Sequence, residues 1–420
     1  MKLKKYKLGD LCTFVNGRAY LQPELQNYGK YKIVRVGNLS GGNNSWYYSD
    51  MELEPTKYCA KGDLLYAWAC NFGPYIWKGD KTIYHYHIWK VINSEQIDKM
   101  YLYYLLKFMT NSFMGCVHGS TMLHITKENM ESMEVRIHAS IEEQRRIATI
   151  LNKLDCKIEL NRQINDNLEA MAKQLYDYWF VQFDFPNEEG KPYKSSGGAL
   201  VYNEELKREI PQGWHCYELN KWLEIKSGFA FKSETYISKG KFKVVTIKNV
   251  QDHHLDTSSC DYVYEIPQGM KEWCSLSVND RLISLTGNCG RLCIVTENDL
   301  LLNQRVGLLA CNDEYIDYAY LLLSSEEYQT LSNNLAKGAA QANLSPVDLC
   351  KNIAVLPKLD VLEKFNRQIK PIVASYIQNE IQIAELTKQR DELLPLLMNG
   401  QASVNYHLSV YFFRAFSYII

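Results

Sequence analysis

The feature that most constrains this chain is an internal repeat, because a duplicated segment must fold into two copies of one structure. Segments of the first half return in the same order in the second half. The matched pairs are 15–17 and 226–228, 31–39 and 242–250, 62–66 and 279–283, 71–73 and 288–290, and 119–126 and 338–345. The separation between partners grows slowly along the chain, as small loop insertions in the second copy would produce. The repeat therefore predicts two copies of one domain.

Each copy shows the signals of an α+β domain. Runs rich in β-branched residues at 32–36 and 243–247 predict strands, and 299–302 and 305–309 continue the sheet in the second copy. Short apolar segments at 100–106 and 318–323 predict one late helix in each copy. We therefore expect a tandem duplication of an α+β domain whose sheet is antiparallel or mixed.

A helical segment follows each copy. Ser140 with Glu143 forms a capping-box pattern, and Asp360 with Glu363 repeats it. In the first segment the apolar positions are Ile147, Leu151, Leu154 and Ile158, and then, on a shifted face, Ile164, Leu168, Met171, Leu175 and Tyr178. In the second segment they are Ile369, Val373, Tyr376, Ile383, Leu386, Leu393 and Leu397. Such stripes are typical of a coiled-coil seam, although ordinary core helices carry them too.

Two further features, polar residues in the seam and a proline, affect how these helices are expected to pair and where they are expected to break. Asn161 and Asn165 lie inside the first seam, where polar residues fix the register of a helix pair. Pro371 predicts a break, so we expect a short helix followed by a long one that starts near Pro371. A helix over about 142–180 would be roughly 57 Å long at 1.5 Å per residue, which suits a spacer better than a domain core.

The pattern divides the chain into six parts. They are a first α+β domain at 1–139, a central helical spacer at 140–184, an exposed Gly-, Pro- and Ser-rich linker at 185–212, a second α+β domain at 213–358, a C-terminal helical spacer at 359–403, and an aromatic tail at 404–420.

Composition sets the outer limits. The net charge of −1 does not by itself indicate a nucleic-acid-binding protein, but a basic patch on one face is compatible with it. The 12 cysteines contain no CxxC pair, which favours buried free thiols in a reducing cytoplasm. The basic start lacks the apolar run of a signal peptide, and no stretch of about 18 apolar residues exists. We therefore expect a cytoplasmic protein with no membrane segment.

Catalytic motifs are missing where an enzyme would need them. An adenine methyltransferase needs a loop that holds the flipped base, and Asn71–Tyr75 only approaches that motif; its counterpart at 288–292 lacks it. No GxGxxG and no GxxxxGK[ST] motif occurs, so neither a dinucleotide nor an ATP site is expected. His85 and His87 have a spacing that would suit a metal, but their counterparts in this alignment are Leu302 and Gln304. We expect no catalytic residue, no metal and no cofactor on this chain.

Several motifs resemble those of the specificity subunits of type I restriction–modification systems. They are 178–181, 183–186, 190–198, 210–214, 142–147 and 394–400, and the resemblance extends over about residues 5–403. It implies that each α+β copy is a target-recognition domain. It also implies that the helices pair antiparallel as a ruler and dock two methyltransferase subunits. Double-stranded DNA, and restriction subunits in the full complex, are further expected partners. S-adenosylmethionine and ATP are expected only on partner subunits. The tail at 404–420 departs from the family pattern.

Base reading requires Arg or Lys for guanine and Asn or Gln for adenine, and phosphates attract cations and helix N-termini. The DNA-contact candidates of the first copy are Asn16, Arg18, Tyr20, Arg35, Asn38, Asn71, Tyr75, Ser120, Thr121 and His124. Those of the second are Lys226, Ser227, Phe229, Lys232, Lys248, Asn249, Asn288, Arg291, Arg305, Lys337 and Gln341.

We therefore predict a non-catalytic, sequence-specific DNA-binding subunit in which each domain reads one half of a bipartite target. One alternative is an adenine DNA methyltransferase with a fused recognition domain, which the missing motifs disfavour. The other is a coiled-coil scaffold that does not bind DNA, which would not need two α+β copies.

Overall fold

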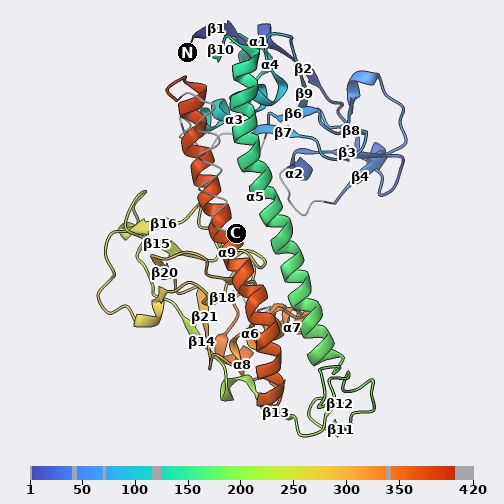
Figure 1. Ribbon diagram of the computed structural model, residues 1–420, viewed down its shortest axis with the longest axis vertical. Coiled ribbons are helices and arrows are strands. Elements are labelled where there is room, and N and C mark those ends of the chain that lie inside the picture. The colour runs from blue at the N-terminus through green and yellow to red at the C-terminus, as the bar shows by residue number, and fades with distance from the viewer. Residues whose placement is uncertain (1, 40–44, 70–71, 116–124, 337–341, 403–420) are drawn as a thin grey trace. The chain divides into compact units, whose positions relative to one another are not determined.

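The computed structural model describes residues 2–39, 45–69, 72–115, 125–336 and 342–402, without the side chains of 111–115. The chain forms two compact units (Figure 1). The first contains residues 1–158 and 385–420, and the second contains residues 159–384. Each unit therefore combines one repeat copy with parts of both long helices. The expected tail at 404–420 lies outside the described residues.

The first unit is built on two four-stranded sheets, with strand orders β2-β9-β6-β7 and β4-β3-β8-β5, and a separate β1-β10 pair. Its strands are β1 Leu3–Lys7, β2 Cys12–Asn16, β3 Tyr31–Val34, β4 Tyr47–Ser49, β5 Tyr58–Cys59, β6 Leu64–Ala67, β7 Gly73–Ile76, β8 Thr82–Tyr84, β9 Ile88–Asn93 and β10 Glu134–His138. Its shorter helices are α1 Leu8–Leu11, α2 Val36–Leu39, α3 Lys99–Gly115 and α4 Lys127–Ser132.

The second unit repeats this topology strand for strand, with orders β14-β21-β18-β19 and β16-β15-β20-β17 and a β13-β22 pair. Its strands are β13 His215–Glu218, β14 Glu224–Ser227, β15 Phe242–Val245, β16 Asp261–Val263, β17 Ser275–Leu276, β18 Arg281–Ser284, β19 Leu292–Ile294, β20 Leu300–Leu302, β21 Val306–Ala310 and β22 Ile353–Leu356. Its shorter helices are α6 Ile316–Ser324, α7 Glu326–Ala336 and α8 Pro346–Cys350.

The matching topology confirms the predicted tandem duplication of an α+β domain. In both copies one of the two four-stranded sheets mixes parallel and antiparallel pairing. In the first copy β3 runs parallel to β8, and in the second β15 runs parallel to β20. The predicted strands occur within a residue or two of their expected positions. Both β-branched runs leave the strand two residues early, since Val36 begins α2 and β15 ends at Val245.

Two long helices pass through both units, α5 over Ile141–Tyr176 and α9 over Leu359–Met398, and a π-helical turn, η3 over Asp177–Val181, extends α5. Within the first unit, Asp155 of α5 bonds to Arg390 of α9 at 2.8 Å. Within the second unit, Asn161 bonds to Gln382 and Asn165 to Glu380, both at 2.7 Å. Later residues of α5 thus meet earlier residues of α9, so the helices pair antiparallel.

The seam of α5 does not move to a shifted face after Ile158. It continues through Asn161, Asn165, Ala172 and Tyr176, all of which are buried. The buried amides remain in the seam because α9 supplies their hydrogen-bond partners. The predicted continuation through Ile164, Met171 and Tyr178 is wrong: these side chains are 37%, 52% and 39% exposed.

Two expectations for the helix starts and breaks need revision as well. Ser140 caps α5 as predicted, accepting a bond from the Glu143 amide at 3.4 Å. Asp360 is not the cap of α9, since the helix begins one residue earlier. The predicted break at Pro371 does not occur, and α9 continues through it. Pro371 faces solvent, where the carbonyl that it frees is open to hydration, and buried Ile369 and Tyr376 anchor the helix on either side.

The Gly- and Pro-rich segment after η3 is mostly exposed, as expected, but it is ordered. Asp184 accepts two bonds from Ser195, at 2.7 Å from its amide and 2.6 Å from its hydroxyl. The ring of Phe185 stacks between those of Tyr193 and Trp214. A hairpin of β11 Leu200–Asn203 and β12 Arg208–Pro211 completes the segment. Aromatic packing therefore holds a region that the composition predicts to be a plain linker.

Candidate nucleic-acid interface

In each unit the loops that follow four of the strands (β2, β3, β6 and β8 in the first unit) converge at one edge of the domain. In the first unit, hydrogen bonds join Arg18 to Tyr84, Tyr86 to Arg18 and His85 to Val34, at 2.9–3.1 Å. We call the converging segments 16–20, 35–38, 67–68 and 85–87 the first loop edge. The carboxyl ends of β2, β3, β6 and β8 all deliver side chains to it.

The second unit builds the same edge with the same backbone bonds. Phe229 donates to Leu302, Gln304 to Phe229 and Asn303 to Val245, at 2.8–3.0 Å. We call segments 227–231, 246–249, 284–291 and 303–305 the second loop edge. Gly17 and Gly228 are required here, because a Cβ at either would collide with carbonyl oxygens of the turn it crosses.

This geometry corrects the alignment of the two copies at one turn. Gly17 donates to Ile88, and Gly228 donates to Val306. Trp68 donates to His87, and Leu285 donates to Arg305. The counterparts of His85 and His87 are therefore Asn303 and Arg305, not Leu302 and Gln304.

Aromatic rings dominate the first loop edge, and the DNA-contact prediction missed most of them. The ring of Trp68 lies 5.1 Å from that of His87 and 6.0 Å from that of Tyr86. The rings of Tyr86 and His87 are 3.9 Å apart, and His85 lies 4.6 Å from Tyr86. Burial, and then the neighbouring His87 and Arg35, lower the pKa of His85 to about 4, so its ring is neutral. The signal in the sequence that could have indicated this aromatic cluster is the His-Tyr-His run at 85–87, between two apolar strands.

Two candidates of the first edge are held by the protein itself. Arg18 is bound to Glu24 at 2.7 Å and lies over the ring of Tyr20. The hydroxyl of Tyr20 is buried without a partner among the described atoms, and burial raises its pKa. Its ring stacks on His85 at 6.2 Å. Tyr20 therefore supports Arg18 and His85, and its hydroxyl is turned away from solvent.

The paired asparagines after β3 and β15 shape turns. Asn38 accepts a bond from the Arg35 amide at 3.0 Å, and Asn249 accepts one from the Thr246 amide at 2.8 Å. Asn249 is fully buried and also donates to Asp256 at 2.9 Å. Asn249 therefore shapes this turn from inside the protein, and in this structure none of its surface is exposed for the predicted DNA contact. Arg35 donates to the Ser45 carbonyl at 2.6 Å and lies over the ring of Tyr47.

The remaining candidates of the first copy divide by position. Asn16 is exposed at the end of β2, at the edge. Tyr75 lies inside β7, half-buried, instead of in a loop, so its predicted role is not supported by its place in the fold. Asn71, Ser120, Thr121 and His124 lie outside the described residues, as do Lys337 and Gln341 of the second copy.

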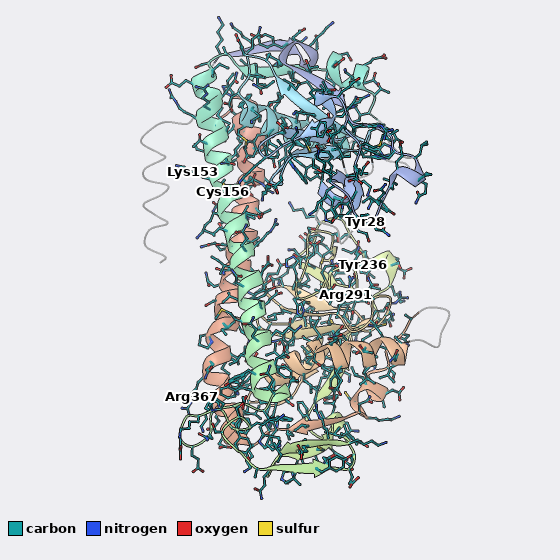
Figure 2. All side chains as sticks on the ribbon, turned by 90° about the vertical axis from the view of Figure 1, so that its right-hand side faces the viewer. Tyr28, Lys153, Cys156, Tyr236, Arg291 and Arg367 are labelled. Carbon is teal, nitrogen blue, oxygen red and sulfur yellow. The ribbon has the colours of Figure 1, made fainter. Side chains whose placement is uncertain are left out.

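The second loop edge presents polar side chains beside the rings of Phe229 and Phe231, which lie 5.2 Å apart. Arg291 bonds to Gln251 at 2.9 Å and to Asp252 at 3.2 Å, and Asn288 lies beside it in position to accept from its guanidinium. Arg305 and Gln304 are exposed. Figure 2 shows Arg291 and Tyr236 on the surface of this unit and, on the first unit, Tyr28, which is 80% exposed.

Five more candidates of the second copy lie along 226–248. Ser227 and Lys232 are exposed, whereas Phe229 is half-buried against the core. Lys226 lies 3.6 Å from Glu224, and Lys248 lies 3.4 Å from Asp261. These lysines face solvent, so DNA phosphate can compete for them at low cost.

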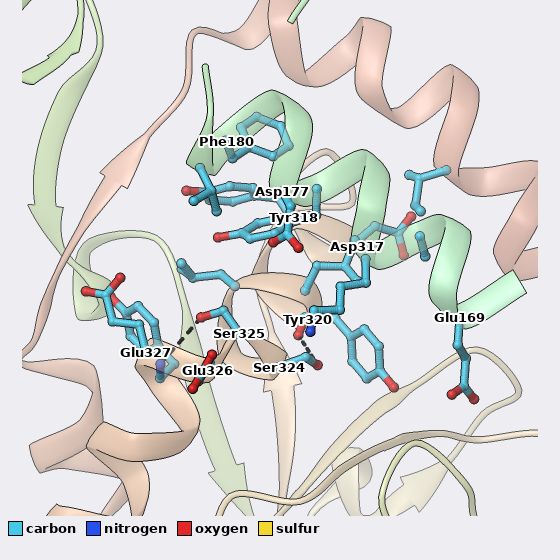
Figure 3. A pocket seen from close by; sticks show the side chains of 18 of the residues that line it. Glu169, Asp177, Phe180, Asp317, Tyr318, Tyr320, Ser324, Ser325, Glu326 and Glu327 are labelled. Carbon is cyan, nitrogen blue, oxygen red and sulfur yellow. Dashed lines mark hydrogen bonds between the residues drawn. The ribbon is translucent and has the colours of Figure 1, made fainter. Parts of the chain in front are cut away.

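A cavity of about 640 Å³ lies in the second unit between α5, α6, α7 and α9 (Figure 3). Tyr318 and Tyr328 donate to the carbonyls of Val355 and Ile353 at 2.5 and 3.2 Å. Burial, and then the nearby Asp166, raise the pKa of Glu169 on its wall to about 7. None of the second copy's DNA-contact candidates is among its described lining residues, so the cavity is separate from the second loop edge.

Metal and thiol chemistry find no support in the described parts of the chain. Within those ranges, His, Cys, Asp and Glu nowhere gather in a group of three or more that would hold a metal ion. Most described cysteines are buried, and burial raises the pKa of the Cys12 and Cys59 thiols to about 12, far from a reactive thiolate. No helix among the described residues has the length and apolar character to cross a membrane.

Comparison with known proteins follows the same division of the chain. A family model for the type I restriction modification DNA specificity domain matches residues 2–170 and 211–390. The MjaIX specificity subunit of Methanocaldococcus jannaschii is 30% identical over 328 residues, covering 75% of this chain and 71% of that protein. The HindI specificity subunit of Haemophilus influenzae is 23% identical over 465 residues, covering 95% and 99%.

The fold has a solved counterpart. The S subunit of a type I restriction–modification system from M. genitalium matches with a TM-score of 0.55 at 18% identity, covering 94% of this chain and 96% of that one. The duplicated units, the antiparallel helices and the family model thus lead to one conclusion: this chain belongs to the type I restriction–modification DNA specificity subunits.

Proposed function

We propose that each unit reads one half of a bipartite DNA sequence through its loop edge. The observation that carries this proposal is the contrast between the two edges. Their backbones are fixed by equivalent hydrogen bonds, yet the turn at the first edge carries His85, Tyr86 and His87 beside Trp68, and the turn at the second edge carries Asn303, Gln304 and Arg305. A shared frame with different polar and aromatic groups is what two different base sequences require.

The chain itself acts without catalysis. Its loop edges contain no base-holding motif for methyl transfer, and the charged groups on them serve binding. S-adenosylmethionine and ATP then belong to partner subunits: two methyltransferase subunits, and restriction subunits in the full complex. We place this assembly in the cytoplasm, where its double-stranded DNA target lies.

An exposed apolar stripe on α5 offers a surface for a methyltransferase subunit. Leu160, Ile164, Met171 and Tyr178 are 37–52% exposed. At about 100° per residue the side chains of Leu160, Ile164 and Met171 fall within a narrow arc of α5, beside the seam and not in it. Tyr178 lies in the turn η3 that extends this helix. Apolar side chains aligned on one exposed face are typical of a surface that a partner covers.

A single substitution that introduces a negative charge into the stripe tests this docking surface. Met171→Glu should reduce capture of the methyltransferase subunit at least tenfold, because it places a carboxylate in the middle of an apolar contact. Val201→Glu is the matched control, since Val201 is 51% exposed but lies on the β11–β12 hairpin. Equal loss in both variants, or capture unchanged by Met171→Glu, would reject the stripe as the docking surface.

The functional proposal as a whole is tested by reconstitution. The purified chain should bind DNA but transfer no labelled methyl group from S-adenosylmethionine. Adding the methyltransferase subunit should produce methylation at one bipartite sequence. Methyl transfer by the chain alone would contradict the non-catalytic role, and methylation without sequence preference would contradict DNA reading.

A further inference from the structure

We propose that the three-residue turn between β8 and β9, and its equivalent between β20 and β21, determines which bases each unit reads. The turns are residues 85–87 and 303–305. This inference rests on the proposed function and adds the element that carries the specificity.

The backbone of each turn is fixed in the same way. Its middle residue donates to the loop that crosses it: Tyr86 to Arg18, and Gln304 to Phe229, at 2.9 and 2.8 Å. The flanking strands are anchored in the core, since Tyr84 and Ile88 of the first copy are fully buried. Substitutions in the turn therefore change its chemistry with little effect on the scaffold, which is what a specificity element requires.

Within the second turn, two side chains are available to DNA. Asn303 is buried, and its Oδ1 accepts a bond from the Arg305 amide at 3.1 Å, so it holds the turn. Gln304 and Arg305 are exposed. Among the described residues, no acidic group lies within ion-pair distance of Arg305, whereas Lys226, Lys248 and Arg291 each have one nearby.

This chemistry indicates the kind of bases that the second unit reads. The guanidinium of arginine binds guanine through two bonds, and the amide of glutamine binds adenine in the same way, both in the major groove. The second turn is therefore suited to a purine contact by Arg305, Gln304 or both.

The first turn has a different chemistry. His85 is packed between Tyr20 and Tyr86, and its ring is neutral. Tyr86 is 38% exposed and lies beside His87 and Trp68. These rings offer apolar faces and no arginine fork, which suits contact with the methyl group of thymine better than paired bonds to guanine.

A reciprocal exchange of side chains tests the inference in the complex with the methyltransferase subunit. Gln304→Tyr with Arg305→His gives the second turn the corresponding residues of the first, and Tyr86→Gln with His87→Arg does the opposite. We expect each double variant to lose methylation of the original site by about 10- to 100-fold, the cost of one specific base contact. The mapped motif should change only in the half read by the altered unit.

Arg305→Ala provides a test that does not depend on a new contact forming. It should relax the second half-site alone, while Lys351→Ala, which removes an exposed lysine 2.9 Å from Asp348 and outside the second loop edge, should leave the motif unchanged. Thermal unfolding and methyltransferase capture equal to wild type establish that each variant is folded.

The possible outcomes distinguish a failure of the turns as specificity elements from a failure of DNA reading by the units. If folded variants retain the original motif and rate, the turns do not determine specificity and this inference is wrong, although DNA reading by the units stands. A change in both half-sites also overturns it. If the wild-type complex shows no sequence preference, the proposed function itself fails.

Discussion

The two units share every paired strand of the repeat but solve one packing problem in different ways. In the second unit, Arg281 at the start of β18 is buried and bonds to Asp317 of α6 at 2.6 Å. At the equivalent places in the first unit stand Leu64 at the start of β6 and Met100 in α3, with Leu64 fully buried and Met100 packed against the same core. The same scaffold thus accepts either an ion pair or an apolar pair at this position.

The difference teaches which parts of a duplicated fold are constrained. Glycines at chain crossings and asparagines that shape turns are retained in both copies, because the backbone requires them. Side chains that only need a complementary neighbour, such as Arg281 with Asp317, change as pairs. Side chains at the loop edges differ most, since they face solvent and any ligand that binds there.

The largest effect is expected from breaking the buried ion pair. Asp317→Ala leaves the Arg281 charge buried and should lower the free energy of unfolding of the second unit by about 3–5 kcal/mol. Arg281→Leu combined with Asp317→Met imports the apolar pair of the first unit and should recover most of that loss. Hydrogen exchange measures each unit separately. If the double variant is as unstable as the single one, the two packing solutions are not interchangeable.

A smaller effect should depend on pH and distinguish the units. The pKa of Glu169 is raised from 4.5 to about 7, mainly by burial, so the folded state favours the protonated form. Stability is therefore lost as pH rises from about 5 towards 8. Asp166, Glu380, His254 and Tyr376 also face this group, and the hydrogen bond that His254 donates to Glu380 raises the pKa of His254, which adds a loss in the same direction.

Glu169→Gln should consequently raise the stability of the second unit at pH 8 by about 1–3 kcal/mol and change it little at pH 5. Hydrogen exchange of the first unit is the internal control, because its equivalent position on α9 is the uncharged Thr387. Equal stabilisation at both pH values would show that Glu169 is not protonated in the folded state.

The smallest effects should be equal in the two units. Thr126 caps α4, and Ser345 caps α8, each accepting a backbone bond at 3.2 Å. Replacing either with Ala should cost about 1 kcal/mol. Because these caps are equivalent in the repeat, a large difference between the two values would show that the local structures have diverged more than their backbones indicate.

The sequence alone predicted the repeat, the strands and the long helices, because glycine spacing and apolar period are local signals. It failed where a distant partner decides the outcome. Asn161 and Asn165 lie in the seam as predicted, but the predicted shift to Ile164, Met171 and Tyr178 is wrong because contacts with α9 keep the seam on one face. The predicted break at Pro371 is wrong because buried residues hold α9 on both sides. At the loop edges, residue type alone could not show that Asn249 and the Tyr20 hydroxyl point inward, or that His85–His87 form an aromatic cluster.

The measurement that most directly tests the central claim is an exchange of one recognition domain. Residues 213–357 are replaced with the same domain of a relative that has a different target, and the methylated motif of the reconstituted complex is mapped. The account predicts that one half of the motif changes to that of the donor while the other half remains. A change in both halves, or in neither, would contradict independent reading by the two units.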